Sequence, residues 1–201
     1  DHNVGQITAA LEEAGLADST TVVYSSDHGD NAGARGLWGK SNMYQESVAV
    51  PLLVSDPDLA PGTCGTPVSL LDLSATLLDL AGVEMPDYFQ GASLRSILEG
   101  RDLSDAHRNF VRSEYFDALD PHFTGGTGTY ATMHRTRTHK LCVYHGKGVG
   151  ELFDLENDPW EHENLWDDPV HADLKHRLLA ESFDAHVLLT TDVGSERIAP
   201  M

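Results

Sequence analysis

Positive charge is scarce in this 201-residue sequence. Its 13 Lys and Arg residues are outnumbered by 32 Asp and Glu residues, which gives a formal net charge of -19 with neutral His. Such a chain repels nucleic-acid backbones and anionic membranes, so we expect neither as a partner. An anionic ester would be repelled as well, unless local cations and a metal reverse the electrostatic field at one site.

Cysteine and long apolar runs are also nearly absent. Cys64 and Cys142 are the only two cysteines, which are too few for a disulfide framework or a zinc-cysteine cluster. No apolar run reaches the length of a membrane span, and no signal peptide opens the chain. The first residues lead directly into a helix, so we expect the chain to begin inside a longer protein. The compartment and the oligomeric state stay open.

The residues that can carry chemistry gather in residues 20–40. Thr20–Tyr24 is a β-branched and aromatic run that is typical of a buried strand. Asp27 and His28 follow it after two serines, at the point where a strand opens into a loop, and α/β sheets place ligands at such strand ends. The glycine-rich loop that continues from there ends at Lys40.

Asp27 and His28 can present two ligands to one divalent cation if the loop turns sharply, which Gly29 allows. Oxygen ligands favour calcium or magnesium, whereas an imidazole also suits manganese. Two ligands are too few to hold a metal well. Lys40 carries a compact ammonium that suits a tetrahedral anion. The alternative is an ordinary surface loop, in which Asp27 caps a turn and the other two side chains are solvated.

Several longer strings recur in order along the chain: SSDHG, GLWGK, YQESVAVPLLVS, LLDLSATLLDLAGV, GASL and ELFDLENDPWEHENL. In this order they resemble the carboxyl-terminal half of the sulfatase branch of the alkaline phosphatase superfamily. The resemblance implies hydrolysis of a sulfate ester, on a small molecule or a glycan, with a divalent metal that is most often calcium. It matches Asp27 and His28 to the metal-binding pair of the family, and Lys40 to the lysine that contacts the sulfate group.

The family's nucleophile has no counterpart in this sequence. Members use a formylglycine made within a CxPxR-type motif, and no such motif is present. The paired aspartates that complete the metal site are missing too. We therefore expect the nucleophile-bearing half to be absent and the chain alone to be inactive. Two alternatives remain: a phosphonate or phosphodiester hydrolase of the same superfamily, or a non-catalytic module that binds an anion or a partner.

Further candidates surround this centre. Arg35 is a weaker candidate for contact with the substrate anion, and Glu46 is expected to order the loop rather than to touch substrate. Asp30 is either a carboxylate that orients His28 or an exposed turn residue. His134 is the candidate for reading the far end of the substrate, within a basic cluster that is otherwise read as a solvated loop: His134, Arg135, Arg137 and His139.

The pattern predicts an α/β fold. Residues 1–103 are expected to form the carboxyl-terminal part of an alkaline-phosphatase-like α/β sheet domain, and residues 104–201 a small four-stranded antiparallel sheet with a packing helix. In the first part we expect a second buried strand over Val48–Val54, with Pro51 at its edge or entry. Residues 69–81 predict a helix that Ser69 and Asp72 cap and whose leucines pack in the core.

Overall fold

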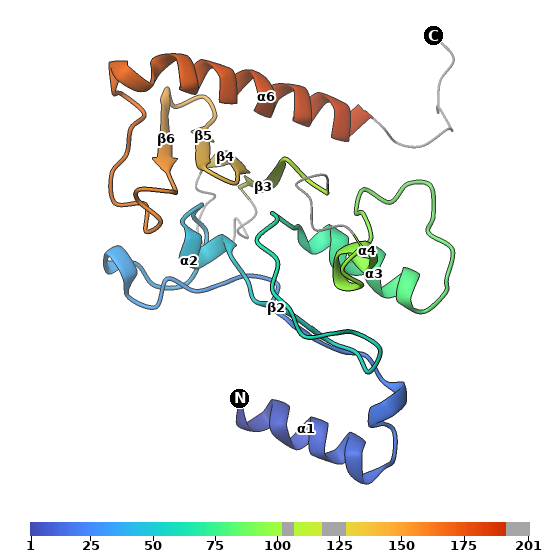
Figure 1. Cartoon of the computed structure of the whole chain (residues 1–201). Coiled ribbons are helices and arrows are strands. Elements are labelled where there is room, and N and C mark those ends of the chain that lie inside the picture. Colours follow the sequence, from blue (N-terminus) through green and yellow to red (C-terminus); the bar gives the residue numbers. More distant parts are fainter. Residues whose placement is uncertain (102–106, 118–127, 192–201) are drawn as a thin grey trace.

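The computed structural model describes residues 1–101, 107–117 and 128–191, with side chains as far as residue 188. It combines helices with two antiparallel sheets, and the predicted mixture of α and β structure is therefore confirmed. In Figure 1, helix α6 (Ala172–Thr191) lies across one end of the molecule and helix α1 (His2–Glu13) lies at the opposite end. The expected boundary between residues 103 and 104 falls outside the described residues.

The amino-terminal region leads into a two-stranded sheet. Helix α1 (His2–Glu13) and a short 3-10 turn (Ala17–Ser19) precede strand β1 (Val22–Ser25), which pairs antiparallel with β2 (Leu52–Ser55). The prediction that these strands are buried is wrong for this chain. Tyr24 is 48% exposed and Leu53 is 61% exposed, because a two-stranded ribbon offers no further layer to cover its faces.

The second strand also begins later than predicted. Helix α2 (Gln45–Val48) takes the first of the residues assigned to the strand, and the strand itself starts at Leu52. Pro51 lies immediately before the strand, because it has no backbone N–H to donate to the ladder. Its carbonyl accepts a hydrogen bond from the Ser25 hydroxyl at 2.9 Å, which closes this end of the sheet.

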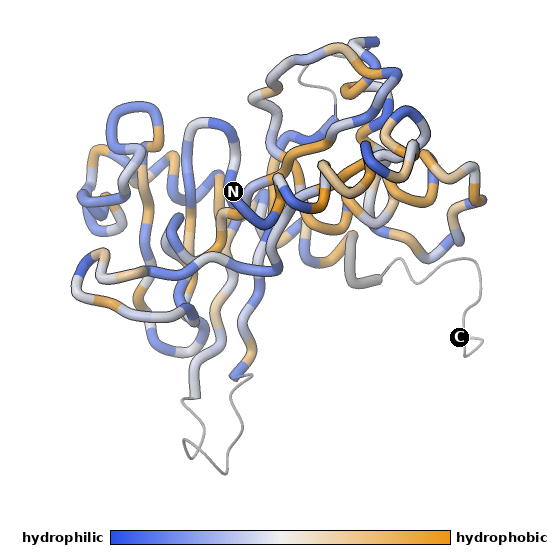
Figure 2. The backbone as a smooth tube through the Cα atoms, turned by 90° about the horizontal axis from the view of Figure 1, so that it is seen from below, coloured by the Kyte–Doolittle hydropathy of each residue, from blue (hydrophilic) through white to orange (hydrophobic). Residues whose placement is uncertain are grey.

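Helix α3 (Leu70–Leu80) forms where the sequence predicts it, but it buries a different face. The side chains buried along it are Asp72, Ala75 and Thr76. Leu71 is 51% exposed and Leu77 is 45% exposed, so the prediction that the leucines lie in the core is wrong within the described part of this chain. Figure 2 shows hydrophobic segments on the side of the molecule where α3 and the short helix α4 (Arg95–Leu98) lie.

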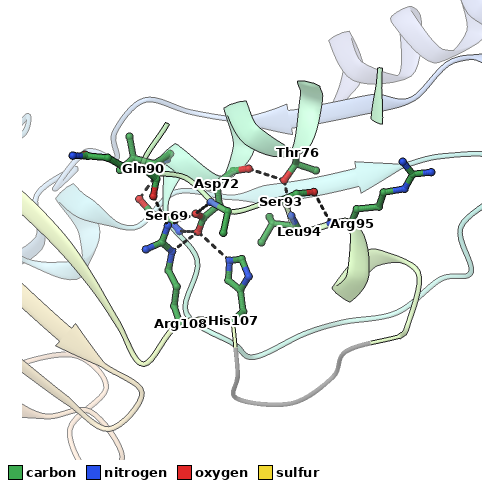
Figure 3. A network of polar contacts seen from close by, with 11 residues as sticks. Ser69, Asp72, Thr76, Gln90, Ser93, Leu94, Arg95, His107 and Arg108 are labelled. Carbon is green, nitrogen blue, oxygen red and sulfur yellow. Dashed lines mark hydrogen bonds and ion pairs between the residues drawn. The ribbon is translucent and has the colours of Figure 1, made fainter. Parts of the chain in front are cut away.

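Asp72 organises the surroundings of α3 (Figure 3). With Ser69 it makes the predicted capping box, and its carboxylate also accepts a hydrogen bond from the Ala92 amide at 2.9 Å. The guanidinium of Arg108 and the imidazole of His107 contact the same carboxylate. Burial raises the pKa of Asp72, but Arg108 and the backbone amides outweigh it, so that the pKa is lowered. One ionised carboxylate therefore joins α3 to the segment that enters strand β3 (Phe110–Phe116).

The remainder is the predicted four-stranded antiparallel sheet with a carboxyl-terminal helix. The strands pair in chain order, and they are β3 (Phe110–Phe116), β4 (Tyr130–Thr136), β5 (His139–Tyr144) and β6 (Val149–Asp154). One face packs on α6 (Ala172–Thr191) through Leu141, Leu152 and Leu178. The other face packs on Met43 and Val48 through Met133 and Cys142, and so it approaches the loop that carries Lys40.

Both cysteines are free, Cys64 at the surface and Cys142 in the interior. None of the helices in the described part of the chain has the length and hydropathy that a membrane crossing requires.

Candidate active site

A tight turn after β1 places Asp27 and His28. The Ser26 hydroxyl donates to the His28 carbonyl at 2.7 Å, and the Gly29 amide donates to the Ser47 carbonyl at 2.9 Å. A Cβ on Gly29 would lie 2.0 Å from the carbonyl oxygen of Glu46. Only glycine allows the turn to approach α2 this closely, so the sharp bend that the two ligands require is built into the backbone.

The imidazole of His28 is held in one orientation. Its Nδ1 lies 2.7 Å from the Gly29 carbonyl oxygen, which can only accept, so Nδ1 carries the proton. The other ring nitrogen, Nε2, lies 3.5 Å from Oδ2 of Asp27. In the neutral ring, the hydrogen bond at Nδ1 would leave Nε2 free for a metal and would fix the orientation of the ring.

Asp27 stays ionised in this setting. Desolvation raises its pKa, but His28, two backbone amides and Lys40 together outweigh it, and the net result is a lowered pKa. The carboxylate is 85% exposed and accepts a hydrogen bond from the His28 amide at 3.1 Å. It is an accessible oxygen ligand beside an accessible nitrogen ligand.

The loop after this turn closes on itself and returns Lys40 to the same place. Asn31 donates to the Gly39 carbonyl from its backbone at 2.8 Å and from its side chain at 2.6 Å. Asp30 accepts from the Gly39 amide at 3.2 Å and from the Ala32 amide at 2.7 Å. Asp30 thus bonds to the loop backbone in the described structure, and Lys40 lies close enough to Asp27 to lower its pKa.

Asp27, His28 and Lys40 line one groove of about 490 Å³, here called the Lys40 groove. Its opposite wall is formed by β3 and β4, where Val111–Tyr115, Met133 and Arg135 are among the lining residues. Residues 64–70, which lead into α3, form its third side. The groove therefore lies between the part that carries the Asp-His pair and the small antiparallel sheet.

Arg35 is occupied elsewhere. One nitrogen of its guanidinium, Nη1, donates to both carboxylate oxygens of Glu46 at 2.9 and 2.8 Å, and the guanidinium lies 4.1 Å from the centre of the Tyr44 ring. It also donates to the carbonyls of Trp160 and Glu161. Arg35 is not among the residues that line the Lys40 groove. It joins its loop to a distant segment, and Glu46 takes part in ordering that loop.

His134 points away from the groove. It is 1% exposed, stacks on Phe110 with ring centroids 4.7 Å apart, and lies 3.8 Å from Glu181 on α6. Successive side chains of a strand point to opposite faces, so Arg135 takes the groove side instead. Arg135 belongs to the predicted basic cluster, although the candidate predicted within it is His134. The alternation of side chains along β4 shows which of the two faces the groove, once the face that packs on α6 is known.

The residues present fit part of a divalent-metal site. One carboxylate and one imidazole nitrogen are accessible side by side, which suits calcium, magnesium or manganese. Within residues 1–101, 107–117 and 128–191, no three His, Cys, Asp or Glu side chains come together as a complete metal-binding group. The pair supplies two ligands, and the other ligands of such a site would have to come from elsewhere.

The chain is similar to several known proteins. Residues 33–186 match the family model described as N-sulphoglucosamine sulphohydrolase, C-terminal. The choline-sulfatase of Rhizobium meliloti is 35% identical over 173 residues, which are 84% of this chain and 31% of that protein. The chain thus spans about a third of the length of the curated relatives that it matches.

Solved structures of similar proteins share the fold. A protein solved in complex with its substrate D-glucosamine-2-N,6-O-disulfate superposes with a TM-score of 0.80 and 27% identity, over 98% of this chain and 40% of that one. The phosphonate monoester hydrolase of Silicibacter pomeroyi superposes with a TM-score of 0.81 and 29% identity, over 92% of this chain and 38% of that one.

Proposed function

This chain belongs to the sulfatase family and corresponds to its carboxyl-terminal portion, and from this premise we propose that it forms one wall of the active site of a sulfate ester hydrolase. The observation that carries the proposal is that Asp27, His28 and Lys40 line a single groove. The substrate class we propose is a sulfate ester of a small molecule or a glycan. Residues 1–103 would belong to the catalytic α/β domain and residues 104–201 to the small subdomain that closes the groove.

Each of the three side chains has a role that its chemistry supports. Asp27 and His28 would hold a divalent cation, for which we propose calcium, through a carboxylate oxygen and Nε2. A cation bound there would withdraw charge from the oxygens of the sulfate group. Lys40 would bind one of these oxygens and stabilise the charge that develops on them during hydrolysis. The formylglycine nucleophile would come from the part of the relatives' sequence that this chain does not cover.

The test is mutagenesis within a sulfatase polypeptide that includes these 201 residues. Asp27→Ala and Lys40→Ala should each lower kcat/KM for a sulfate ester by at least ~100-fold, because each removes a contact to the transition state or its metal. Asp18→Ala and Lys147→Ala remove the same charges at exposed positions outside the groove. Their kcat/KM for the sulfate ester should remain close to that of the wild type. Near-normal turnover by both groove variants would reject the proposal.

A second candidate is hydrolysis of phosphonate monoesters. The observation in its favour is the similarity to the phosphonate monoester hydrolase of Silicibacter pomeroyi. Lys40 and an Asp-His metal pair suit either tetrahedral group, so the geometry alone does not separate them. Parallel assays of an aryl sulfate, a phosphate monoester and a phosphonate monoester distinguish the two, and we expect the sulfate to have the highest kcat/KM.

A further inference from the structure

Three carboxylates lie on the groove-facing side of the small sheet, and each is engaged by another group. Glu151 accepts hydrogen bonds from the Tyr44 and Tyr144 hydroxyls at 2.9 and 3.0 Å. Arg35 is paired with Glu46 at 2.8 Å. Lys140 is paired with Glu161, Nζ to Oε1, at 2.6 Å, and neither of these two side chains is exposed. The second carboxylate oxygen of Glu161 accepts the first backbone amide of α2 at 2.9 Å. None of these three carboxylates accepts a hydrogen bond from Arg135, the third cation on this face of the described structure.

The position of Arg135 follows from the strand register. It lies directly opposite Lys140 on β5 and opposite Val111 on β3, so two cations stand side by side across neighbouring strands. Its Nε is buried and, within the described residues, has no hydrogen-bond partner. Burial lowers the pKa of the guanidinium, although Glu161 acts in the opposite direction. Burying part of a cation while one of its N–H donors lacks a partner costs free energy, unless an anion pairs with the cation.

Two carboxylates line the groove among the described residues, and Asp27 is the one that we propose as a metal ligand. Glu114 also lines it, but its carboxylate is bound by Arg112 at 2.6 Å. Arg112 in turn donates to the Ser182 carbonyl at 2.9 Å, so that its guanidinium is directed toward α6. Among the described cations that line the groove, Lys40 and Arg135 are therefore the two available to an anion, one on each wall.

We propose that Arg135 forms a second anion-binding site in the Lys40 groove, which takes a sulfate or carboxylate group on the part of the substrate that is not cleaved. This rests on the proposed function, in which Lys40 binds the sulfate that is removed. A planar guanidinium binds either group through two parallel hydrogen bonds, and no chemical step occurs at Arg135. The enzyme would select esters that carry two negative groups, despite the acidic character of the whole chain.

The test compares singly and doubly charged sugars in a sulfatase polypeptide that includes these 201 residues. The probes are a monosulfated hexosamine, the same sugar with a second sulfate, and a monosulfated sugar linked to a uronic acid. Arg135→Gln should lower kcat/KM by at least ~10-fold for one or both doubly charged probes and by less than ~3-fold for the monosulfated one. Arg135→Lys should recover part of the loss. Lys147→Gln removes the same charge from an exposed turn and should leave kcat/KM for all three probes unchanged.

Calorimetric titration of the same probes separates this inference from the proposed function. If the wild type turns over no sulfate ester, the proposed function fails, and the inference is then judged by binding. Weaker binding of a doubly charged probe to Arg135→Gln than to the wild type would support the second site. The probe whose binding is weakened shows whether Arg135 binds a second sulfate or a carboxylate. Equal losses on all three probes would mean that Arg135 only stabilises the fold, and no loss on any would also overturn the inference.

Discussion

At the scale of single residues, neighbouring positions on β4 have opposite roles. His134 is enclosed between Phe110 and α6, whereas Arg135 faces the Lys40 groove. Burial, together with the charge of Arg112, lowers the pKa of His134 to about 4. Neither ring nitrogen has a hydrogen-bond partner among the described residues, and Glu181 lies 3.8 Å away. His134 is therefore a neutral part of the packing beneath α6.

This burial predicts a pH dependence of stability. An ordinary histidine has a pKa near 6.5, so the unfolded chain binds a proton at His134 between pH 6.5 and 4 that the folded chain excludes. Above pH 6.5 His134 is neutral in both states, so its titration leaves the free energy of unfolding unchanged. As the pH falls from 6.5 toward 4, the unfolded state gains the proton and the free energy of unfolding decreases. Relative to His134→Leu, the wild type should lose up to ~3 kcal/mol of unfolding free energy over this range. Urea titrations at several pH values measure it, and parallel pH profiles for the two proteins would contradict it.

The same pair of residues shows where prediction of the site from sequence ends. The turn at Asp27 and His28 could be foreseen, because a strand end followed by glycine is a local pattern. The choice between His134 and Arg135 could not, because it depends on which face of the sheet packs on α6. That packing is set by residues more than thirty positions away, such as Leu178.

At the scale of elements, the Lys140–Glu161 pair connects β5, α2 and the segment after β6. Glu161 binds Lys140 at 2.6 Å and the backbone amide of Gln45 at 2.9 Å, and its carbonyl accepts from Arg35 at 3.2 Å. Helix α2 lies beside the turn that carries His28, since the Ser47 carbonyl accepts the Gly29 amide. A buried ion pair beside the four-stranded sheet thus supports the loop that forms the groove.

Removal of one partner should therefore be costly. Glu161→Gln leaves Lys140 charged and without a carboxylate in the interior, and we expect it to lower the free energy of unfolding by ~3–5 kcal/mol. Glu163→Gln removes a charge of the same sign from an exposed position two residues away and should change it by less than ~0.5 kcal/mol. Chemical denaturation measures both. A loss below ~1 kcal/mol for Glu161→Gln would show that the pair does not hold these elements together.

Elements whose signals are local were the easiest to predict. The capping box of Ser69 and Asp72 lies within four residues, and α3 begins at Leu70 as expected. The burial of its leucines was predicted wrongly, because burial depends on what covers a helix rather than on its own periodicity. The same reason applies to β1 and β2, whose apolar residues mark a strand correctly but lie on a two-stranded ribbon.

At the scale of the whole molecule, large apolar side chains remain on the surface of α3, β1 and β2. Leu71 and Leu77 on α3 are about half exposed, and Leu53 on β2 is 61% exposed. Exposed apolar surface of this kind favours association in water. The chain also spans about a third of the relatives' length, so the relatives have further sequence that could cover these surfaces.

The isolated 201-residue chain should therefore self-associate. It should also show no turnover of sulfate esters, because its sequence contains no CxPxR-type motif to supply the nucleophile. Sedimentation velocity should detect species larger than the monomer, and Leu71→Glu combined with Leu77→Glu should shift the distribution toward the monomer. Ser74→Glu, at an exposed polar position of the same helix, is the matched control and should leave the association unchanged. A monomeric wild type would contradict the argument from exposed leucines.

The central claim, that Asp27, His28 and Lys40 surround one substrate group, is tested most directly by a crystal structure of a sulfatase polypeptide that includes these residues, grown with calcium and sulfate. The account predicts a calcium ion about 2.4 Å from an Asp27 oxygen, with His28 Nε2 among its ligands and Lys40 Nζ about 3 Å from an oxygen of the same sulfate. A cation bound away from this pair, or a sulfate more than about 6 Å from Lys40 Nζ, would contradict the account.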